Sequence, residues 1–216
     1  MLSEWLRAGR VLPVITPGEV AVTVQLCRTL AAAGMRAVEL TLRSATALEA
    51  MRAVVVEVPQ LQVAAGTVLT PAQLDLVQDA GAAFAVSPGA TPALYRAARS
   101  NAMPLLPGVA TASEVMLGLE QGLDCFKLFP ATPLGGRDLL GALAGPFPEV
   151  QFCPTGGLRA DNFRAFLALP NVICCGGSWM VAADLVAAGD WEAIAALAAE
   201  AMQAEPGHRS GANPDH

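Results

Sequence analysis

Short apolar runs alternate with longer amphipathic stretches along the chain of 216 residues. Eight of these runs have the length and composition of strands: residues 11–15, 37–42, 62–65, 84–87, 103–106, 125–129, 150–153 and 172–175. They recur roughly every 20 to 25 residues, which is the length of one strand–helix unit. The alternation predicts a parallel sheet, either open and doubly wound or closed as a (β/α)8 TIM barrel. Eight regular units favour the α/β barrel.

The stretches between the strands carry helix signals. Residues 18–33 have apolar positions at helical spacing and end at Gly34. Thr70 and Pro71 are typical of a cap and a first turn, and residues 111–114 (Thr-Ala-Ser-Glu) resemble a capping box. Further helices are predicted at residues 158–169 and 191–202.

The two ends of the chain do not resemble targeting segments. Residues 1–7 are expected to form a short N-terminal amphipathic helix, and they lack the basic start and apolar run of a signal peptide. No stretch approaches the roughly 18 apolar residues of a membrane span. We therefore expect one barrel domain over residues 1–204 that works in the cytoplasm. The polar residues 205–216 predict a disordered tail.

Charge and cysteine content narrow the classes of partner. A net charge of −6 argues against a broad surface for nucleic acid or an anionic membrane, although a local site can still bind a small anion. The five cysteines are odd in number and match no metal-binding spacing. We expect them to be reduced and mostly buried.

The single lysine of the chain is the most informative residue. Lys127 lies within the apolar run 125–129, where a charged side chain without a task is unusual. Desolvation favours the neutral amine, which can attack a carbonyl carbon and form an imine. The alternative is a structural ion pair with Glu39 inside the barrel.

Polar residues also follow the second strand. Alternation places Glu39, Thr41 and Arg43 on one face, which points inward in a barrel. A carboxylate there can transfer protons, and an arginine at the strand end can bind a carboxylate with two hydrogen bonds. The alternative is a Glu39–Arg43 pair that satisfies itself.

Glycine pairs follow the last two strands, at Gly156–Gly157 and Gly176–Gly177. Glycines let backbone amides approach an anion closely, and barrels often hold a phosphate at this place. Two tight turns that require positive φ angles are the alternative.

Both histidines, His208 and His216, lie in the tail. A Ser-His-Asp hydrolase and a metal-dependent aldolase with histidine ligands are therefore not expected, and we predict no metal site and no cofactor.

Seven motifs in register resemble the 2-keto-3-deoxy-6-phosphogluconate (KDPG) aldolase family of the Entner–Doudoroff pathway. The likeness extends from about residue 11 to residue 202. The motifs are residues 38–43 (VELTLR), 65–69 (AGTVL), 87–89 (SPG), 107–111 (PGVAT), 127–131 (KLFPA), 152–157 (FCPTGG) and 176–179 (GGSW).

The resemblance implies a class I, pyruvate-dependent aldolase with a barrel fold that forms a homotrimer. Such an enzyme cleaves KDPG to pyruvate and glyceraldehyde 3-phosphate, and many relatives also cleave 4-hydroxy-2-oxoglutarate. Lys127 would form the Schiff base, and Glu39 would be the general acid/base. The substrate-binding residues would be Arg43 and Thr67 at the pyruvate carboxylate, Pro88 and Phe129 beside the keto acid, Thr155 at the hydroxyl groups, and Gly156, Gly157, Gly177 and Ser178 at the phosphate.

One position departs from the family pattern, because Thr132 stands where a glutamate is common. This difference affects the expected fine specificity. The galactonate epimer of the substrate is the main alternative. A catalytically silent barrel that binds a phosphorylated sugar and a sugar-phosphate isomerase or epimerase also stay open.

Overall fold

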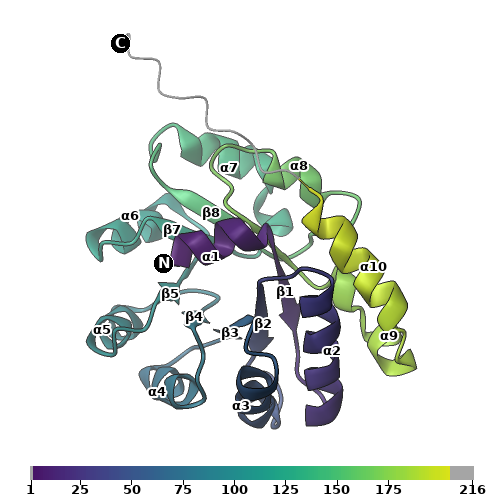
Figure 1. Cartoon of the computed structure of the whole chain (residues 1–216). Helices are drawn as coiled ribbons and strands as arrows, with labels where there is room; N and C mark the ends of the chain where they lie inside the picture. Colours follow the sequence, from purple (N-terminus) through teal and green to yellow (C-terminus); the bar gives the residue numbers. More distant parts are fainter. Residues whose placement is uncertain (1, 205–216) are drawn as a thin grey trace.

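The computed structural model describes residues 2–204, in which strands and helices alternate around one axis (Figure 1). The suggested tail lies outside the described residues. The strands are β1 (Val11–Ile15), β2 (Ala37–Thr41), β3 (Gln62–Gly66), β4 (Phe84–Val86), β5 (Leu105–Leu106), β6 (Gly108–Val109), β7 (Cys125–Leu128), β8 (Gln151–Pro154) and β9 (Cys175–Gly177). The helices are α1 (Leu2–Gly9), α2 (Val20–Ala32), α3 (Ala47–Glu57), α4 (Pro71–Asp79), α5 (Pro92–Ser100), α6 (Ala112–Glu120), α7 (Arg137–Ala144), α8 (Phe163–Leu167), α9 (Ala183–Ala188) and α10 (Trp191–Met202), with 3-10 turns η1 (Thr132–Leu134) and η2 (Trp179–Val181).

The parallel strands curl into a barrel, which confirms the predicted fold class. Six strands form one sheet in the order β5-β4-β3-β2-β1-β9, and three form a second in the order β6-β7-β8. Two junctions connect these sheets. β5 lies within the fifth predicted strand, residues 103–106, and β6 continues the chain beyond it, after Pro107. At the other junction, isolated bridges join Phe152 to Val172 and Thr155 to Gly176.

The fifth strand divides at Pro107. Proline has no amide hydrogen to donate to a ladder, so the strand changes partner there. β5 pairs with β4, whereas β6 pairs with β7. The Pro107 carbonyl still accepts the Lys127 amide at 2.9 Å, so the break lies beside the central lysine.

The eighth strand begins later than its sequence pattern predicts. Residues 172–175 were expected, but the strand paired with β1 is Cys175–Gly177, and Val172 makes only an isolated bridge. Glycine has low strand propensity, so the hydrophobic pattern did not predict Gly176 and Gly177 as strand residues. Backbone pairing with β1 nevertheless places both in the strand. Leu12 and Pro13 are the partners of Gly176 and Gly177.

Helix starts agree well with the sequence, with one exception. Thr70 caps α4 by accepting the Gln73 amide, and Thr111 and Glu114 form the predicted capping box of α6. α8 is shorter than residues 158–169, because the chain first turns. The Asn162 side chain accepts the Arg159 amide at 2.8 Å in that turn, and the helix begins only at Phe163.

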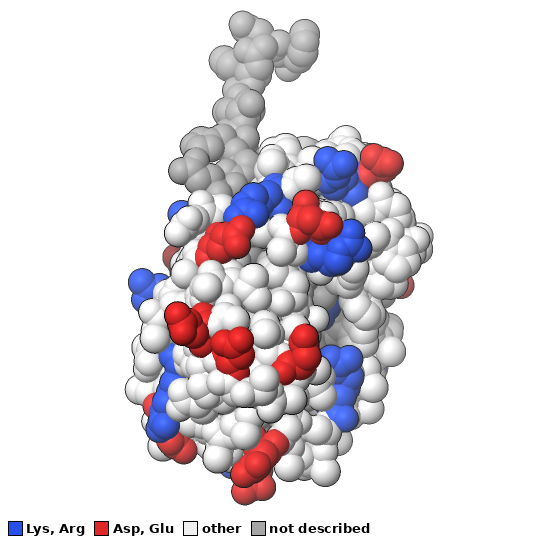
Figure 2. Space-filling view, turned by 90° about the vertical axis from the view of Figure 1, so that its right-hand side faces the viewer, with Lys and Arg blue, Asp and Glu red and all other residues white. Residues whose placement is uncertain are grey.

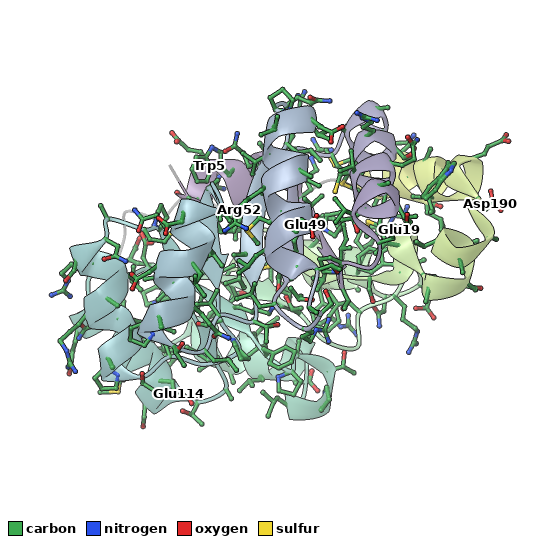
Figure 3. The ribbon with its side chains drawn as sticks, turned by 90° about the horizontal axis from the view of Figure 1, so that it is seen from below. Trp5, Glu19, Glu49, Arg52, Glu114 and Asp190 are labelled. Atoms are coloured by element: carbon green, nitrogen blue, oxygen red, sulfur yellow. The ribbon has the colours of Figure 1, made fainter. Side chains whose placement is uncertain are left out.

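The N-terminal helix closes one end of the barrel. Leu6 is buried together with residues of the barrel interior, and Trp5 stacks on Phe84 with ring centroids 5.8 Å apart. α1 crosses the barrel in Figure 1, and Figure 3 shows Trp5 at the end opposite to Glu114 in the first turn of α6. The carboxyl ends of the strands therefore form the open end, where barrel active sites lie.

All five cysteines are free and buried, as the sequence predicted. Burial raises the pKa of the Cys27 thiol from 9.0 to about 12. Burial is also the main cause that raises the pKa of Cys125, Cys174 and Cys175. These four thiols therefore stay protonated at neutral pH and pack as small apolar side chains.

Figure 2 shows acidic and basic side chains scattered over one face, without a continuous basic area. Among residues 2–204, no helix is both long enough and apolar enough to cross a membrane.

Candidate active site

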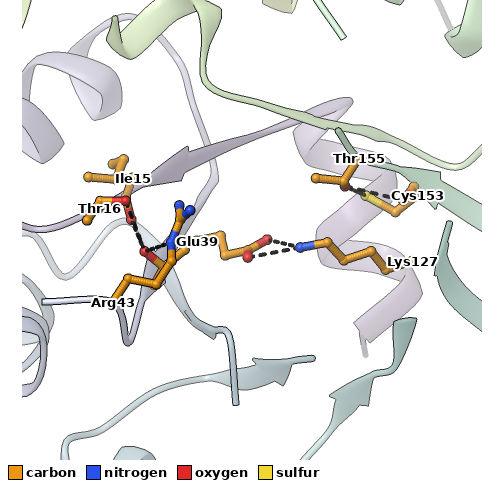
Figure 4. A network of polar contacts seen from close by, with 8 residues as sticks. Ile15, Thr16, Glu39, Arg43, Lys127, Cys153 and Thr155 are labelled. Atoms are coloured by element: carbon orange, nitrogen blue, oxygen red, sulfur yellow. Dashed lines mark hydrogen bonds and ion pairs between the residues drawn. The ribbon is translucent and has the colours of Figure 1, made fainter. Parts of the chain in front are cut away.

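A buried ion pair crosses the interior of the barrel between β7 and β2 (Figure 4). Lys127 Nζ donates to Glu39 Oε1 at 3.0 Å and to Oε2 at 3.2 Å. The two residues are only 5% and 1% exposed. The structure thus contains the Lys127–Glu39 pair that the sequence offered as one reading. The suggested Glu39–Arg43 pair is wrong, because Glu39 faces the lysine instead.

This pair has the composition of a nucleophile with its proton acceptor. An ammonium group cannot attack a carbonyl, but transfer of one proton across the 3.0 Å contact leaves a free amine and a carboxylic acid. Phe129 lies on the amine side, with Nζ 5.3 Å from the ring centroid. The surroundings of Nζ are therefore partly aromatic, which fits an apolar wall for a small carbonyl compound.

Gly66, at the end of β3, makes room for the carboxylate. A Cβ at this position would lie 2.4 Å from Glu39 Oε1 and 2.6 Å from Glu39 Cγ. Because Glu39 and Ala64 are register partners on neighbouring strands, the side chain passes directly over Gly66. The glycine of the AGT motif is thus required by the acid, which the sequence alone did not reveal.

Thr67 and Pro88 follow the third and fourth strands, β3 and β4. Thr67 follows Gly66 with a φ of 60°, a backbone conformation that is rare for a β-branched residue and that clusters at functional sites. The Pro88 carbonyl packs against Gly108, where a Cβ would lie 2.1 Å from the oxygen. Gly108 is the register partner of Lys127. Thr67 thus follows β3, the neighbour of the Glu39 strand, and Pro88 packs on β6, the neighbour of the Lys127 strand.

Arg43 lies at the barrel mouth, where its Nε donates to Thr41 Oγ1 at 3.2 Å. Its exposed side chain and Ser178 line one cavity of about 520 Å³ between the β1 and β9 ends, α2 and α9. Neither Lys127 nor Glu39 lines this cavity. Arg43 and Ser178 therefore share a cavity that the ion pair does not line.

Thr155 directly follows β8, which pairs with the strand of Lys127. Its hydroxyl donates to the Cys153 carbonyl at 3.4 Å, and Cys153 is the register partner of Lys127. Gly176 gives Thr155 its space, because a Cβ there would lie 2.2 Å from Thr155 Oγ1. This role of Gly176 is a packing constraint that no sequence pattern indicated.

The Gly156–Gly157 turn has the backbone that its residues predicted. Both glycines have positive φ angles, of 99° and 82°. The Asn162 side chain donates to the Gly157 carbonyl at 3.2 Å and thereby ties the turn to the start of α8. Because α8 begins only at Phe163, the helix start expected directly behind the turn is wrong. Only the backbone of the turn itself therefore stays as the candidate anion site.

The glycines of both turns also serve packing. A Cβ at Gly157 would lie 2.6 Å from Thr132, and a Cβ at Gly177 would lie 2.1 Å from the Trp179 ring. Trp179 in turn stacks on Phe163, with centroids 4.9 Å apart. A bulky substitution at either glycine would therefore test packing and ligand binding together.

Within residues 2–204, no cluster of three or more His, Cys, Asp or Glu side chains could hold a metal ion.

Known proteins share this architecture and much of this sequence. The model of the family described as KDPG and KHG aldolase matches residues 2–197. A KHG/KDPG aldolase of Escherichia coli K12 is 50% identical over 198 residues, which cover 92% of this chain and 93% of the relative.

Two solved structures are similar over nearly their whole length. A KDPG aldolase of Legionella pneumophila, with pyruvate captured as a covalent carbinolamine, has a TM-score of 0.90 and 41% identity, covering 92% of this chain and 97% of the other. A 2-keto-3-deoxy-6-phosphogluconate aldolase of Zymomonas mobilis with 3-phosphoglycerate has a TM-score of 0.90 and 42% identity, covering 95% and 96%.

The packing of Gly66 generates a testable prediction. In Gly66→Ala the new Cβ must displace Glu39, so we expect the Lys127–Glu39 distance to lengthen in a crystal structure. We also expect the free energy of unfolding to fall by about 1–3 kcal/mol, as overpacked cores do. Gly141→Ala in α7 is the matched control, since a Cβ there meets nothing within 4 Å. An unchanged ion pair and unchanged stability in Gly66→Ala would contradict this account.

Proposed function

The chain belongs to the KDPG and KHG aldolase family, and we infer that it is a class I aldolase that cleaves KDPG to pyruvate and glyceraldehyde 3-phosphate. The observation that carries this function is the buried Lys127–Glu39 pair at 3.0 Å. It supplies an amine and a proton carrier within one barrel interior. Cleavage of 4-hydroxy-2-oxoglutarate, the other substrate class of the family, uses the same carbon–carbon bond.

Imine formation is the first step. Glu39 takes a proton from Lys127, and the neutral Nζ attacks the C2 keto carbon to give a carbinolamine. Glu39 then returns its proton to the C2 hydroxyl group, which leaves as water, and the imine remains. The relative with pyruvate captured as a carbinolamine contains this intermediate.

Carbon–carbon cleavage follows from the imine. Glu39 accepts the proton of the C4 hydroxyl group, the C3–C4 bond breaks, and its electron pair moves into the iminium as an enamine. The aldehyde leaves with the new carbonyl at C4. Protonation of C3 and addition of water to the imine then release pyruvate and regenerate Lys127. The protein supplies both the electron sink and the proton carrier, which are the two requirements of class I chemistry.

The anionic ends of the substrate require separate receptors. We assign the pyruvate carboxylate to Arg43 and Thr67, with Pro88 and Phe129 along the keto acid. Support comes from the exposed guanidinium of Arg43 and from the place of Thr67 directly after Gly66, beside Glu39. A guanidinium can bind a carboxylate through two parallel hydrogen bonds.

The phosphate is assigned to the turns at Gly156–Gly157 and Gly177–Ser178, with Thr155 at the substrate hydroxyl groups. The bridge between Thr155 and Gly176 brings the two turns side by side at the open end. Positive φ angles at Gly156 and Gly157 suit a concave backbone that binds anions. The phosphoglycerate complex of the Zymomonas mobilis relative agrees with a phosphate-bearing ligand.

The gluconate epimer is preferred to the galactonate epimer because the named relatives are of the gluconate type. Thr132 contacts the phosphate turn at Gly157, so its effect is expected on specificity rather than on imine chemistry. A silent binding barrel or a sugar-phosphate isomerase would not require the buried lysine and its acid.

We also propose a homotrimer. Four large apolar side chains on the part of the barrel that carries α4 to α6 are exposed: Leu69, Leu76, Met116 and Leu119. Light scattering should give a mass three times the chain mass of 22.2 kDa, and Met116→Asp should lower it. A monomeric wild type would overturn this proposal.

We place the enzyme in the Entner–Doudoroff pathway and in the cytoplasm, since a phosphorylated sugar acid is made and kept inside cells. The buried free thiols agree with a reducing compartment. Normal growth on gluconate of a strain that lacks the gene would contradict the pathway assignment.

The imine is tested by borohydride reduction with pyruvate. We expect one carboxyethyl group, at Lys127, located by peptide mass spectrometry. Lys127→Arg keeps a positive charge opposite Glu39, so it should fold but neither trap pyruvate nor turn over KDPG. Trapping only at the N-terminal amine, or normal turnover by folded Lys127→Arg, would overturn the mechanism.

The phosphate assignment is tested at Ser178, because glycine substitutions there also disturb packing. We expect Ser178→Ala to lower kcat/KM for KDPG about tenfold relative to kcat/KM for 4-hydroxy-2-oxoglutarate, since it removes a hydrogen bond to a charged group. Competition by inorganic phosphate should weaken in parallel. Ser113→Ala, on the exposed surface of α6, is the control. An unchanged ratio would place the phosphate elsewhere.

A further inference from the structure

We propose that Thr41 is a positioning residue that fixes the orientation of Arg43, so that only the outer edge of its guanidinium receives the ligand's oxyanion. The inference rests on the proposed role of Arg43 in binding the substrate carboxylate. Arg43 Nε donates to Thr41 Oγ1 at 3.2 Å. In Figure 4 the dashed lines that begin at Arg43 lead on to Ile15 and Thr16.

The Thr41 hydroxyl is itself held firmly. Thr41 is fully buried at the end of β2, and its hydroxyl donates to the Ile15 carbonyl at 3.0 Å. It also contacts Thr16 Oγ1 at 3.3 Å. Its proton is therefore directed at β1, and its lone pairs face Arg43. Arg43 Nε carries a hydrogen and therefore needs an acceptor. The Thr41 oxygen provides one, because its own hydrogen is already given to the Ile15 carbonyl.

The guanidinium has two edges that can bind an oxyanion through two bonds. One edge combines Nε with one terminal nitrogen, and the other combines the two terminal nitrogens. Because Nε is occupied by Thr41, the first edge is closed to a ligand. The second edge keeps both of its N–H donors, one from each terminal nitrogen, and Arg43 as a whole is exposed. The structure thereby selects one of two binding geometries before substrate arrives.

This arrangement also removes freedom from a long side chain. An exposed arginine loses rotamer entropy when it orders around a ligand, and a side chain ordered beforehand loses less. The ordered edge borders the cavity of about 520 Å³ that Ser178 also lines. Two anionic groups of the substrate could reach it, the carboxylate and the phosphate. We commit to the carboxylate, and the experiment separates the two.

The test uses Thr41→Val, which keeps the shape and removes the acceptor, in the full-length enzyme. The pyruvate concentration that half-saturates borohydride trapping should rise about tenfold, while the maximal trapping rate changes less than about twofold. Thr41→Ser should recover most of the lost affinity. Thr29→Val is the matched control, because its buried hydroxyl donates to the Gln25 carbonyl on α2, away from the site. In an Arg43→Lys background, which lacks the Nε donor, Thr41→Val should add little.

Three outcomes would overturn parts of this account separately. No effect of Arg43→Lys on pyruvate affinity would contradict the proposed function of Arg43. An effect of Arg43→Lys without one of Thr41→Val would contradict the positioning role of Thr41. Weaker inhibition by inorganic phosphate in Thr41→Val, with pyruvate affinity unchanged, would assign Arg43 to the phosphate and overturn the proposal.

A structure of the wild type with reduced pyruvate on Lys127 gives an answer that does not depend on how the variants fold. The carboxylate should contact both terminal nitrogens of Arg43, with Nε still on Thr41. A carboxylate held by Nε and one terminal nitrogen would overturn the proposal.

Discussion

The buried ion pair between Lys127 and Glu39 is the constraint around which the barrel interior is arranged. Removing two charges from water is costly, and only close pairing compensates for it. Loss of one partner leaves an unpaired buried charge, at a cost of about 3–5 kcal/mol in other proteins. The pair is therefore poorly suited to stabilise the fold, and the reaction that we propose gives a reason for its presence. In the proposed mechanism the same contact is the path for one proton.

The need to hold this ion pair in place explains several small residues around it. Gly66 leaves space for the Glu39 side chain, and Gly176 does the same for Thr155. Pro107 ends the ladder between β4 and β5 and turns the chain toward the strand that carries Lys127. These positions have no chemistry of their own. They fix the acid, the amine and the hydroxyl group relative to one another, which is the main contribution of a rigid barrel to catalysis.

The sequence indicates the repeats and the buried Lys127 because both produce local signals. Apolar runs mark the strands, and a single lysine within such a run is conspicuous. Contacts between distant segments give no local signal. The partner of Arg43 is Thr41 rather than Glu39, which depends on the side-chain directions at the end of β2. The late start of α8 depends on the turn that the Asn162 side chain holds. The late start of β9 depends on the pairing of Gly176 and Gly177 with β1. Such features require the assembled barrel.

The central claim is that Lys127 and Glu39 act as one unit, and hydrogen exchange at the pyruvate methyl group tests it most directly. In D2O the wild type should exchange these hydrogens through the enamine, as followed by proton NMR without any aldehyde present. We expect no exchange above background with Lys127→Arg. With Glu39→Gln we expect a rate lower by about 10²-fold, the scale of general acid–base catalysis. Exchange at the wild-type rate in Glu39→Gln, or persistent exchange in folded Lys127→Arg, would contradict the account.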